Sequence, residues 1–377
     1  MKSLIKRNAS LLLGLCMIII LLLIPTGYED AAIYKQSEKC VAKVIAVDDS
    51  AIISSGLIKS GEQSCTLLIL TGKFKGETTE GYNLLSGSLE SDKIYKAGDK
   101  ALVLISHKDG KILSTNMVDV YRINKELLLA AVFIIFLIAF AGKTGLYAIL
   151  SFVITILSIW KILVPCCLKG INPIWISVLI VAALTFIIIV FVYGFDKRSL
   201  VATLGSLLGT ITTCILGICF TDYFQIHGAV MSYSETLLYC GYSSLNLTQI
   251  FMSSIFIGAS GAMMDLSVDI TSAVYEVVQK KPEIRPLEAI KSGFNIGRAA
   301  MGTMTTTLLL AYSGGYLALL MTFMAQGTPI INILNYKYVS AEILQTIVGS
   351  FGLVTVAPFT AIVAGLLLTK KNTADSL

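Results

Sequence analysis

The feature that most constrains this chain is a series of apolar runs, each long enough to form a membrane-spanning helix. About 20 apolar residues in an α-helix cross the roughly 30 Å hydrocarbon core of a bilayer. Only 14% of the residues are charged, whereas a soluble domain has about 25%. The sequence therefore predicts a membrane all-α protein, an eight-helix polytopic bundle with spans at residues 9–25, 126–142, 145–165, 173–193, 199–220, 248–275, 301–324 and 342–369.

Positive charges beside the apolar runs predict how the chain crosses the membrane. Short loops on the cytoplasmic side carry an excess of Lys and Arg. With the N-terminus inside, the cytoplasmic side receives Lys2, Lys6, Arg7, Lys143, Lys197, Arg198, Lys280, Lys281, Arg285, Lys291, Arg298, Lys370 and Lys371. The short loops on the other side receive only Lys169 and Lys337. We therefore expect a multi-pass protein of the bacterial cytoplasmic membrane, with both termini cytoplasmic and residues 28–125 extracytoplasmic.

The formal net charge of +5 reflects this basic rim. A nucleic-acid-binding domain gathers its Lys and Arg on one face, whereas here they are spread over several short loops. The expected partner is therefore the lipid bilayer and not a nucleic acid. Nothing in the sequence decides the oligomeric state, so a homo-oligomer stays open.

Residues 1–27 are predicted to form an N-terminal signal-anchor helix. Met1–Arg7 is basic and Ala9–Ile24 is apolar, which is the pattern of a secretory signal peptide. No clean cleavage motif follows, because Asp30-Ala31-Ala32 matches one poorly. An uncleaved anchor is favoured, with a cleaved signal peptide as the alternative.

Residues 28–125 are predicted to form a small extracytoplasmic β-barrel or sandwich domain between the first two spans. Asp109-Gly110 is a hairpin-turn signal, and about five short strands suit a barrel of OB-like form. No catalytic constellation is visible here, so the expected role is gating or the binding of a protein partner. The clearest strand patterns are Cys40–Asp48, Cys65–Thr71, Ala101–Ser106 and Lys111–Val118.

Cysteines and histidines predict neither a zinc site nor a cofactor. Cys40 and Cys65 lie in the external domain, where a disulfide is chemically permitted. If they are reduced, they should react with an impermeant thiol reagent from outside. No CxxC motif or Cys/His cluster exists, and the only histidines are His107 and His227. A zinc site of ordinary composition is therefore not expected.

The sixth span carries two carboxylates, Asp265 and Asp269, in an otherwise apolar run. A charge at the membrane centre costs about 2.5–3.5 kcal/mol on insertion scales, so such groups usually face a bundle interior or an aqueous path. The two acids are therefore candidates for a proton or ion path. The alternative is that they lie at a helix end and are simply solvated. Spacings of three and four residues place on one helical face Gly258, Ala262, Asp265, Asp269, Ser272 and Glu276.

Residues 126–377 are predicted to be a seven-helix transmembrane domain with a cytoplasmic amphipathic segment at 277–300. Lys291, Asn295 and Arg298 share one face of that segment, which runs into the seventh span. They are candidate charge partners for Glu276 or Asp269. Anionic lipid headgroups would satisfy the cations equally well.

Hydroxyl groups supply three further path candidates, Ser260, Thr303 and Thr306. Serine and threonine in membrane helices often bond a carbonyl of their own helix, so these residues need not be functional. The fifth span carries a stripe of small residues that predicts close helix packing, with lining of a substrate path as the alternative. Its members are Ala202, Gly205, Gly209, Thr213 and Gly217.

No enzyme is predicted. Gly258-Ala-Ser-Gly261 reproduces the GxSG of rhomboid-type intramembrane proteases, but their serine needs a histidine base and no span contains one. Aspartyl intramembrane proteases use Asp residues on two facing helices, whereas Asp265 and Asp269 share one helix. Gly142-Lys-Thr144 resembles a Walker fragment, but Leu137 occupies the first glycine position and no phosphate loop exists.

Several motifs and the order of the spans resemble the YibE/F family of bacterial membrane proteins over nearly the whole chain. The resemblance implies the architecture described above and brings no assigned biochemical activity. Ala299 stands where the family usually has Asp, and Thr306 where it usually has Asn, so this chain has lost some polar capacity. The matching motifs are Gly258-Ala-Ser-Gly-Ala262, Asp265, Glu276, Ser292-Gly293, Asn295-Ile-Gly-Arg298, Gly302-Thr-Met304, Leu310-Ala-Tyr312, Gly349-Ser-Phe-Gly352 and Pro358-Phe-Thr360.

A second, partial likeness concerns the acidic span, the helix at Leu287–Ser292 and the threonine-rich span that follows. Together they are similar to half of the transmembrane module of the resistance–nodulation–division exporters and the SecDF translocation factors. That half-module also begins with one span and a large external domain, and its membrane acids carry protons. This chain has one additional hairpin, its second and third spans.

The leading expectation is a secondary transporter or exporter of unknown substrate, proton-coupled through intramembrane acids. Asp265 would be the proton or cation site, Asp269 would assist, and Asn295 and Arg298 would tune or pair with it. The alternative is a non-transporting accessory or assembly factor that binds a partner through its external domain. In that case the acids and Arg298 would only hold helices together.

Overall fold

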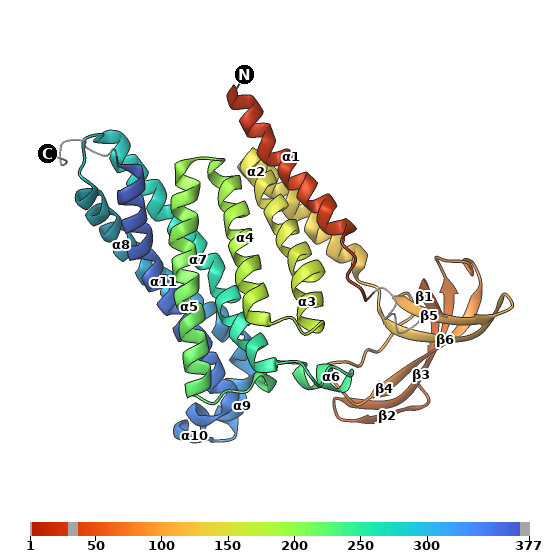
Figure 1. The fold of residues 1–377 in the computed structure, drawn as a ribbon. Helices are drawn as coiled ribbons and strands as arrows, with labels where there is room; N and C mark the ends of the chain where they lie inside the picture. The colour runs from red at the N-terminus through yellow and green to blue at the C-terminus, as the bar shows by residue number, and fades with distance from the viewer. Residues whose placement is uncertain (1, 29–36, 370–377) are drawn as a thin grey trace. The chain divides into compact units, whose positions relative to one another are not determined.

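Figure 1 shows the fold in a computed structural model, which describes residues 2–28 and 37–369. The chain divides into two compact units. Tyr28–Phe140 contains a β-barrel, whereas Met1–Gly27 and Ala141–Leu377 form a helical unit. The poor cleavage motif at Asp30-Ala31-Ala32 and the cations Lys370 and Lys371 lie outside the described residues.

The β-barrel confirms the small barrel predicted for the N-terminal part of the chain. Strand β1 pairs with both β3 and β5, which closes five strands in the order β1-β5-β6-β4-β3. All pairings are antiparallel except β4–β6, which meet in parallel at Tyr82 and Asn116. This is a Greek-key barrel of OB-like form, with β2 added at the edge of β3. The strands are β1 (Ser37–Asp48), β2 (Ile52–Ser55), β3 (Ile58–Ile69), β4 (Thr78–Ser86), β5 (Lys100–Lys108) and β6 (Lys111–Val120).

Alternating apolar residues fill the barrel, because successive side chains of a strand point to opposite faces. On β1, Ala42 and Val44 are fully buried, and on β5 Val103 and Ile105 are fully buried. The predicted turn between β5 and β6 is also present. Its residues Asp109 and Gly110 have φ angles of 50° and 76°, as a type I′ hairpin turn requires.

Cys40 and Cys65 are both free thiols buried in the barrel core. The strand register places Cys40 opposite Val103 and Cys65 opposite Val47, so the two thiols are not paired. Burial, with the nearby charge of Asp49, raises the pKa of the Cys65 thiol to about 11. The expectation that both thiols react from outside is therefore wrong, because the folded barrel shields them and keeps them protonated.

Among the described residues, six helical segments are long and apolar enough to cross a membrane. Their bounds are Ile123–Leu168, Pro173–Tyr193, Lys197–Tyr223, Leu247–Lys280, Pro286–Ala325 and Lys337–Leu368. The helices are α1 (Lys2–Leu23), α2 (Ile123–Ser158), α3 (Val164–Leu168), α4 (Pro173–Tyr193), α5 (Lys197–Tyr223), α6 (Ser234–Tyr239), α7 (Leu247–Lys280), α8 (Pro286–Ser313), α9 (Leu317–Ala325), α10 (Ile330–Asn335) and α11 (Lys337–Leu368). Shorter turns are η2 (Ile159–Leu163), η3 (Gly228–Val230) and η4 (Gly314–Tyr316).

Helix α2 is interrupted at the point where the sequence places a boundary between two spans. Gly142 has φ 56° and ψ −123°, a conformation outside the helical region that glycine tolerates. Near the other end of this segment, the π-helical turn η2 carries Lys161. Its ammonium group donates a hydrogen bond to the Ile24 carbonyl at 3.1 Å, so α1 is tied to this turn.

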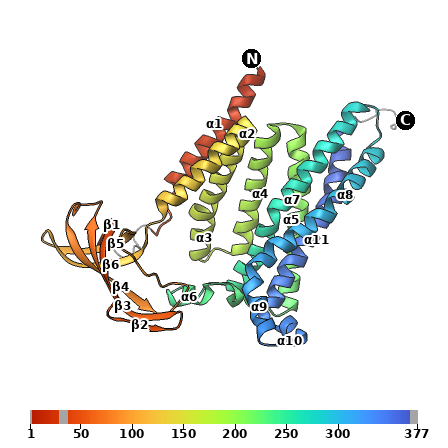
Figure 2. The same cartoon turned by 180° about the vertical axis from the view of Figure 1, so that it is seen from behind.

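Helices α5, α7 and α11 pack together at the centre of the helical unit (Figures 1 and 2). The small residues of α5 permit this packing. A Cβ atom at Gly205 would collide with Thr360, and one at Gly209 with Val356, both on α11. The stripe predicted in the fifth span is therefore a helix-packing surface.

Helix α8 packs against α11 through its own small residues, since Gly293 lies against Ala361 and Gly297 against Ala357. It runs without interruption from Pro286 to Ser313. The predicted amphipathic segment is therefore not a separate helix: residues 277–280 complete α7, and residues 286–300 are the first half of α8. The predicted seventh span is divided at Gly314, where the short turn η4 separates α8 from α9.

Candidate functional site

Helix α7 carries the acids, and its sequence explains its position in the unit. The Asn246 side chain accepts a hydrogen bond from the Gln249 amide at 3.0 Å and caps the N-terminus. The helix has 34 residues, about 51 Å at 1.5 Å per residue, and Asp265 is the nineteenth of them. One side is fully buried against α5 and α11, at Ala259, Met263, Leu266 and Ile270.

The opposite side of α7 is an uncovered acidic stripe. Asp265, Asp269 and Glu276 are all exposed there, as is Gly258. Ala262 and Ser272 are half-buried at its borders. The residues that the spacing assigned to one face therefore do share one face, and the three acids are its uncovered part. Within those residues neither Asp265 nor Asp269 forms an ion pair or a hydrogen bond.

Tyr193 lies beside the C-terminal half of this stripe. From the C-terminal end of α4, its hydroxyl donates to the Val268 carbonyl at 2.6 Å and lies 2.6 Å from the Ser272 hydroxyl. These contacts fix α4 along one border of the stripe. They also place a phenol hydroxyl close enough to Asp269 for the two to interact electrostatically.

Arg198 completes a polar cluster at this end of α7. Its guanidinium carbon lies 5.0 Å from the ring centre of Tyr193 and 4.5 Å from that of Tyr275. The guanidinium also pairs with Asp196 at 2.7 Å. Partial burial acts to raise the pKa of Asp196, but the hydrogen bonds from Arg198 and the Lys197 amide, together with the charges of both residues, hold that pKa below its usual range. Arg198 is thereby positioned at the mouth of the stripe.

The predicted charge partners on α8 lie elsewhere. Lys291, Asn295 and Arg298 are exposed, and none of them forms an ion pair or hydrogen bond within the described residues. Gly297 explains the direction of Arg298, because Gly297 packs against Ala357 and Ile270. The next residue on a helix points about 100° away, so Arg298 leaves this packed face and is exposed.

The three predicted hydroxyl candidates all bond their own helix. The Ser260 hydroxyl donates to the Ile257 carbonyl at 2.7 Å, Thr303 to Ala300 at 3.1 Å, and Thr306 to Gly302 at 3.3 Å. Thr303 and Thr306 are exposed on α8. In this conformation their hydroxyl hydrogens are used within the helix, so none is directed at a carboxylate.

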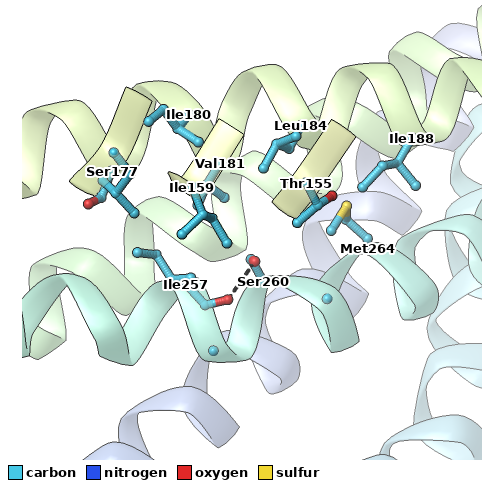
Figure 3. A pocket seen from close by; sticks show the side chains of 13 residues that line it. Thr155, Ile159, Ser177, Ile180, Val181, Leu184, Ile188, Ile257, Ser260 and Met264 are labelled. Atoms are coloured by element: carbon cyan, nitrogen blue, oxygen red, sulfur yellow. Dashed lines mark hydrogen bonds between the residues drawn. The ribbon is translucent and has the colours of Figure 1, made fainter. Parts of the chain in front are cut away.

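A cavity of about 250 Å³ adjoins the N-terminal end of the stripe. Figure 3 shows its walls, which come from α2 and η2 (Thr155, Ile159), α4 (Ile180, Leu184) and α7. The floor on α7 is formed by Gly258, Ser260, Gly261 and Met264, where the two glycines leave room. The cavity is lined mainly by aliphatic side chains and holds no charged group among its described lining residues.

Sequence reasoning missed Tyr193, Arg198 and Tyr275. Arg198 was counted only as a topological charge, because nothing in its local spacing relates it to α7. The three residues come together only when the ends of α4, α5 and α7 pack. No group of three His, Cys, Asp or Glu side chains within residues 2–28 and 37–369 is arranged to hold a metal ion.

Comparison with known proteins agrees with this arrangement. Residues 129–370 match the model of the family described as YibE/F-like protein. Residues 33–120, which contain the barrel, match the YibE/F family N-terminal domain. No curated protein and no solved structure matches the chain.

Proposed function

We propose that this chain, which belongs to the YibE/F family, is a secondary transporter or exporter with Asp265 as its proton or cation site. The substrate is a small molecule or ion that moves along the uncovered face of α7. Asp269 assists Asp265 in holding the proton or cation. Tyr193 and Ser272 mark the inner end of the path, and Arg198 lies at its mouth.

One observation carries the proposal. Asp265 lies near the middle of a helix of membrane length, on its uncovered face, with no cation partner among the described residues. A carboxylate facing lipid at that depth is costly, so the face must line water or meet a partner. A path for protons or ions would line such a face with water. It would also explain why the face carries two acids, Asp265 and Asp269, four residues apart.

The proposed topology has eight spans. To the six long apolar segments it adds α1, and it counts the parts of Ile123–Leu168 on either side of Gly142 as two separate spans. The α4–α5 connection, where α5 begins at Lys197, and the α7–α8 connection, with Lys281 and Arg285, are proposed to be cytoplasmic on the positive-inside rule. The barrel is then extracytoplasmic in the bacterial cytoplasmic membrane.

Proton flux into liposomes tests the proposal. Purified protein is reconstituted with a pH-sensitive dye inside, and a potassium diffusion potential is applied. Asp265→Asn keeps the volume of the side chain and removes only its ionisable group, so we expect inserted protein with at least tenfold lower proton flux, about the size of effect that removing one proton-transfer group has.

Glu276→Gln is the matched control, because Glu276 lies on the same face at the wet end of α7. It should retain most of the flux. Equal flux through the parent and Asp265→Asn would remove Asp265 from any proton path.

A second candidate function is that of an accessory factor whose barrel binds another protein. The observation that favours it is an exposed apolar arm formed by β2, β3 and β4, where Leu57 is 84% exposed, Ile53 69% and Leu84 76%. Exposed apolar patches of this kind mark interaction sites. A photo-crosslinker placed at Leu57 should then give one discrete protein adduct in cells. A photo-crosslinker at Lys75, which is also exposed, is the control and should give none. If neither position gives an adduct, this function is contradicted.

A further inference from the structure

A second cavity, of about 280 Å³, lies between α8, η4, α9 and α11. Its walls are mostly aliphatic, from Leu309, Leu319, Leu320, Ile343 and Ile347. Glu342 of α11 is its only charged residue among the described lining residues. A single carboxylate in an apolar cavity is an uncommon feature that the acidic stripe of α7 does not explain.

Glu342 is held in place but keeps binding capacity. It is half-buried on α11 and hydrogen-bonded to the Tyr316 hydroxyl. A carboxylate offers about four lone-pair positions, and one tyrosine uses only one of them. No Lys or Arg within the described residues pairs with it.

Two aromatic rings accompany this carboxylate, since Tyr312 and Tyr316 both line the cavity. The faces of aromatic rings attract cations, and the attraction grows when the site is desolvated. Tyr312 also links the cavity to α7. Its hydroxyl lies against Gly258, where an added Cβ atom would come within 2.6 Å of it. The cavity therefore lies beside Gly258, at the N-terminal end of the acidic stripe.

We infer that this cavity binds a lipophilic organic cation, an ammonium or phosphonium with apolar substituents. Glu342 supplies the opposite charge, Tyr312 and Tyr316 supply ring faces, and the aliphatic walls receive the substituents. An inorganic cation fits poorly, because it needs six or so oxygen ligands, and an anion would meet the carboxylate. The claim that such a cation is the substrate of the transporter rests on the function proposed above. The claim that the cavity binds such a cation does not.

Calorimetric titration of the purified full-length protein with tetraphenylphosphonium tests the inference. Glu342→Gln keeps the shape of the side chain and a hydrogen-bond acceptor for Tyr316 while removing the charge. We expect it to weaken tetraphenylphosphonium binding at least tenfold. Binding of neutral triphenylphosphine oxide should change less than twofold, since that probe tests only the apolar walls. Glu283→Gln, which removes an exposed carboxylate outside the cavity, should leave both affinities unchanged.

The tyrosines give an independent readout in variants that keep Glu342. Tyr316→Phe retains the ring and should bind the cation within threefold of the parent, whereas Tyr316→Leu should lose fivefold or more. Thermal melting of each variant confirms that it is folded. Equal affinity of the parent and Glu342→Gln for tetraphenylphosphonium would overturn the inference.

The two proposals fail separately. Glu342-dependent binding without any flux through Asp265 would support the cation site and contradict the transporter. Proton flux that depends on Asp265, together with tetraphenylphosphonium binding that does not depend on Glu342, would support the transporter and contradict the cation site.

Discussion

The direction in which a charged side chain leaves its helix decides whether it can find a partner. Arg298 follows Gly297, which is packed against α11 and α7, and Arg298 is exposed without an ion pair among the described residues. Arg198 instead lies over two tyrosine rings and pairs with Asp196. Of the two arginines, Arg198 is therefore the one that stabilises the helical unit.

We predict that Arg198→Ala lowers the free energy of unfolding by about 1–3 kcal/mol, the sum of two partly exposed cation–π contacts and one ion pair. Arg298→Ala should change it by no more than about 0.5 kcal/mol, as for other surface substitutions. Denaturant unfolding of the detergent-solubilised protein measures both. Arg198→Lys, which keeps the charge without the planar group, should recover only part of the loss.

This prediction replaces the one that the sequence alone supports, in which Arg298 pairs with Asp269 or Glu276. A larger loss of unfolding free energy for Arg298→Ala than for Arg198→Ala would support the pairing of Arg298 with one of these acids. Rescue of Arg298→Ala by Asp269→Asn in a double-mutant cycle would identify the partner.

At the scale of single residues, the sequence predicted the acidic stripe because one helix contains all of its members. Asp265 and Asp269 had only to follow helical spacing to share a face. The cluster around Arg198 and the cavity around Glu342 each join residues from three elements. Which residues meet in this cluster and in this cavity depends on how the helix ends pack. The spacing of residues within one helix does not determine that packing.

At the scale of elements, glycine decides which helices approach closely. Gly205 and Gly209 of α5 leave room for Thr360 and Val356 of α11. Gly302 of α8 has open space where a side chain would begin. The same residue type therefore has opposite roles on the two helices.

We expect Gly209→Ala to lower the free energy of unfolding by about 1–3 kcal/mol, because the added methyl group collides with Val356 and the helices must separate. Gly302→Ala is the control and should raise it by up to about 1 kcal/mol, since alanine favours a helix. Thermal or denaturant unfolding checks both variants. Equal effects of the two substitutions would show that α5 and α11 are not in close contact.

Most elements could be predicted, because long apolar runs and β-rich runs are strong local signals. Strand β4 was not delimited, since Thr78–Ser86 begins with Thr-Thr-Glu-Gly and lacks a clear apolar alternation. Helix α8 runs through residue 300, where an amphipathic segment was expected to give way to the seventh span, because Gly293 and Gly297 pack its first half against α11. The sequence predicts a boundary between two spans near Gly142, and the backbone at Gly142 leaves the helical conformation.

At the scale of the whole molecule, the orientation in the membrane can be tested with two engineered cysteines. Ser55→Cys lies on the barrel, and Glu283→Cys lies between α7 and α8; both positions are exposed. An impermeant maleimide added to intact cells should label the first and not the second, because of these two positions only the one on the barrel is proposed to be outside. The opposite pattern would invert the topology.

This experiment needs a chain in which the accessible native thiols are replaced by alanine. Cys40, Cys65 and Cys214 are buried and can remain. Burial raises the pKa of Cys40 and Cys65, so these two should stay unlabelled at neutral pH until the barrel unfolds. The thiols to replace are Cys16, Cys166, Cys167, Cys219 and Cys240.

The central claim is that water reaches the acidic stripe of α7. A transport path must be wet, whereas a stripe that only packs against lipid or another protein must be dry. Gly261 lies one turn from Asp265 and has open space at its Cβ position, so a cysteine fits there. Ile211 of α5 is 48% exposed on the outside of the bundle and provides the matched lipid-facing position.

In the same cysteine background, the most direct measurement is the rate at which a charged methanethiosulfonate reagent modifies each cysteine in native membranes. The reagent attacks only ionised thiols, which require water. We predict that Gly261→Cys reacts at least tenfold faster than Ile211→Cys. Equally slow modification of both cysteines would contradict a hydrated path and leave the stripe as a packing surface.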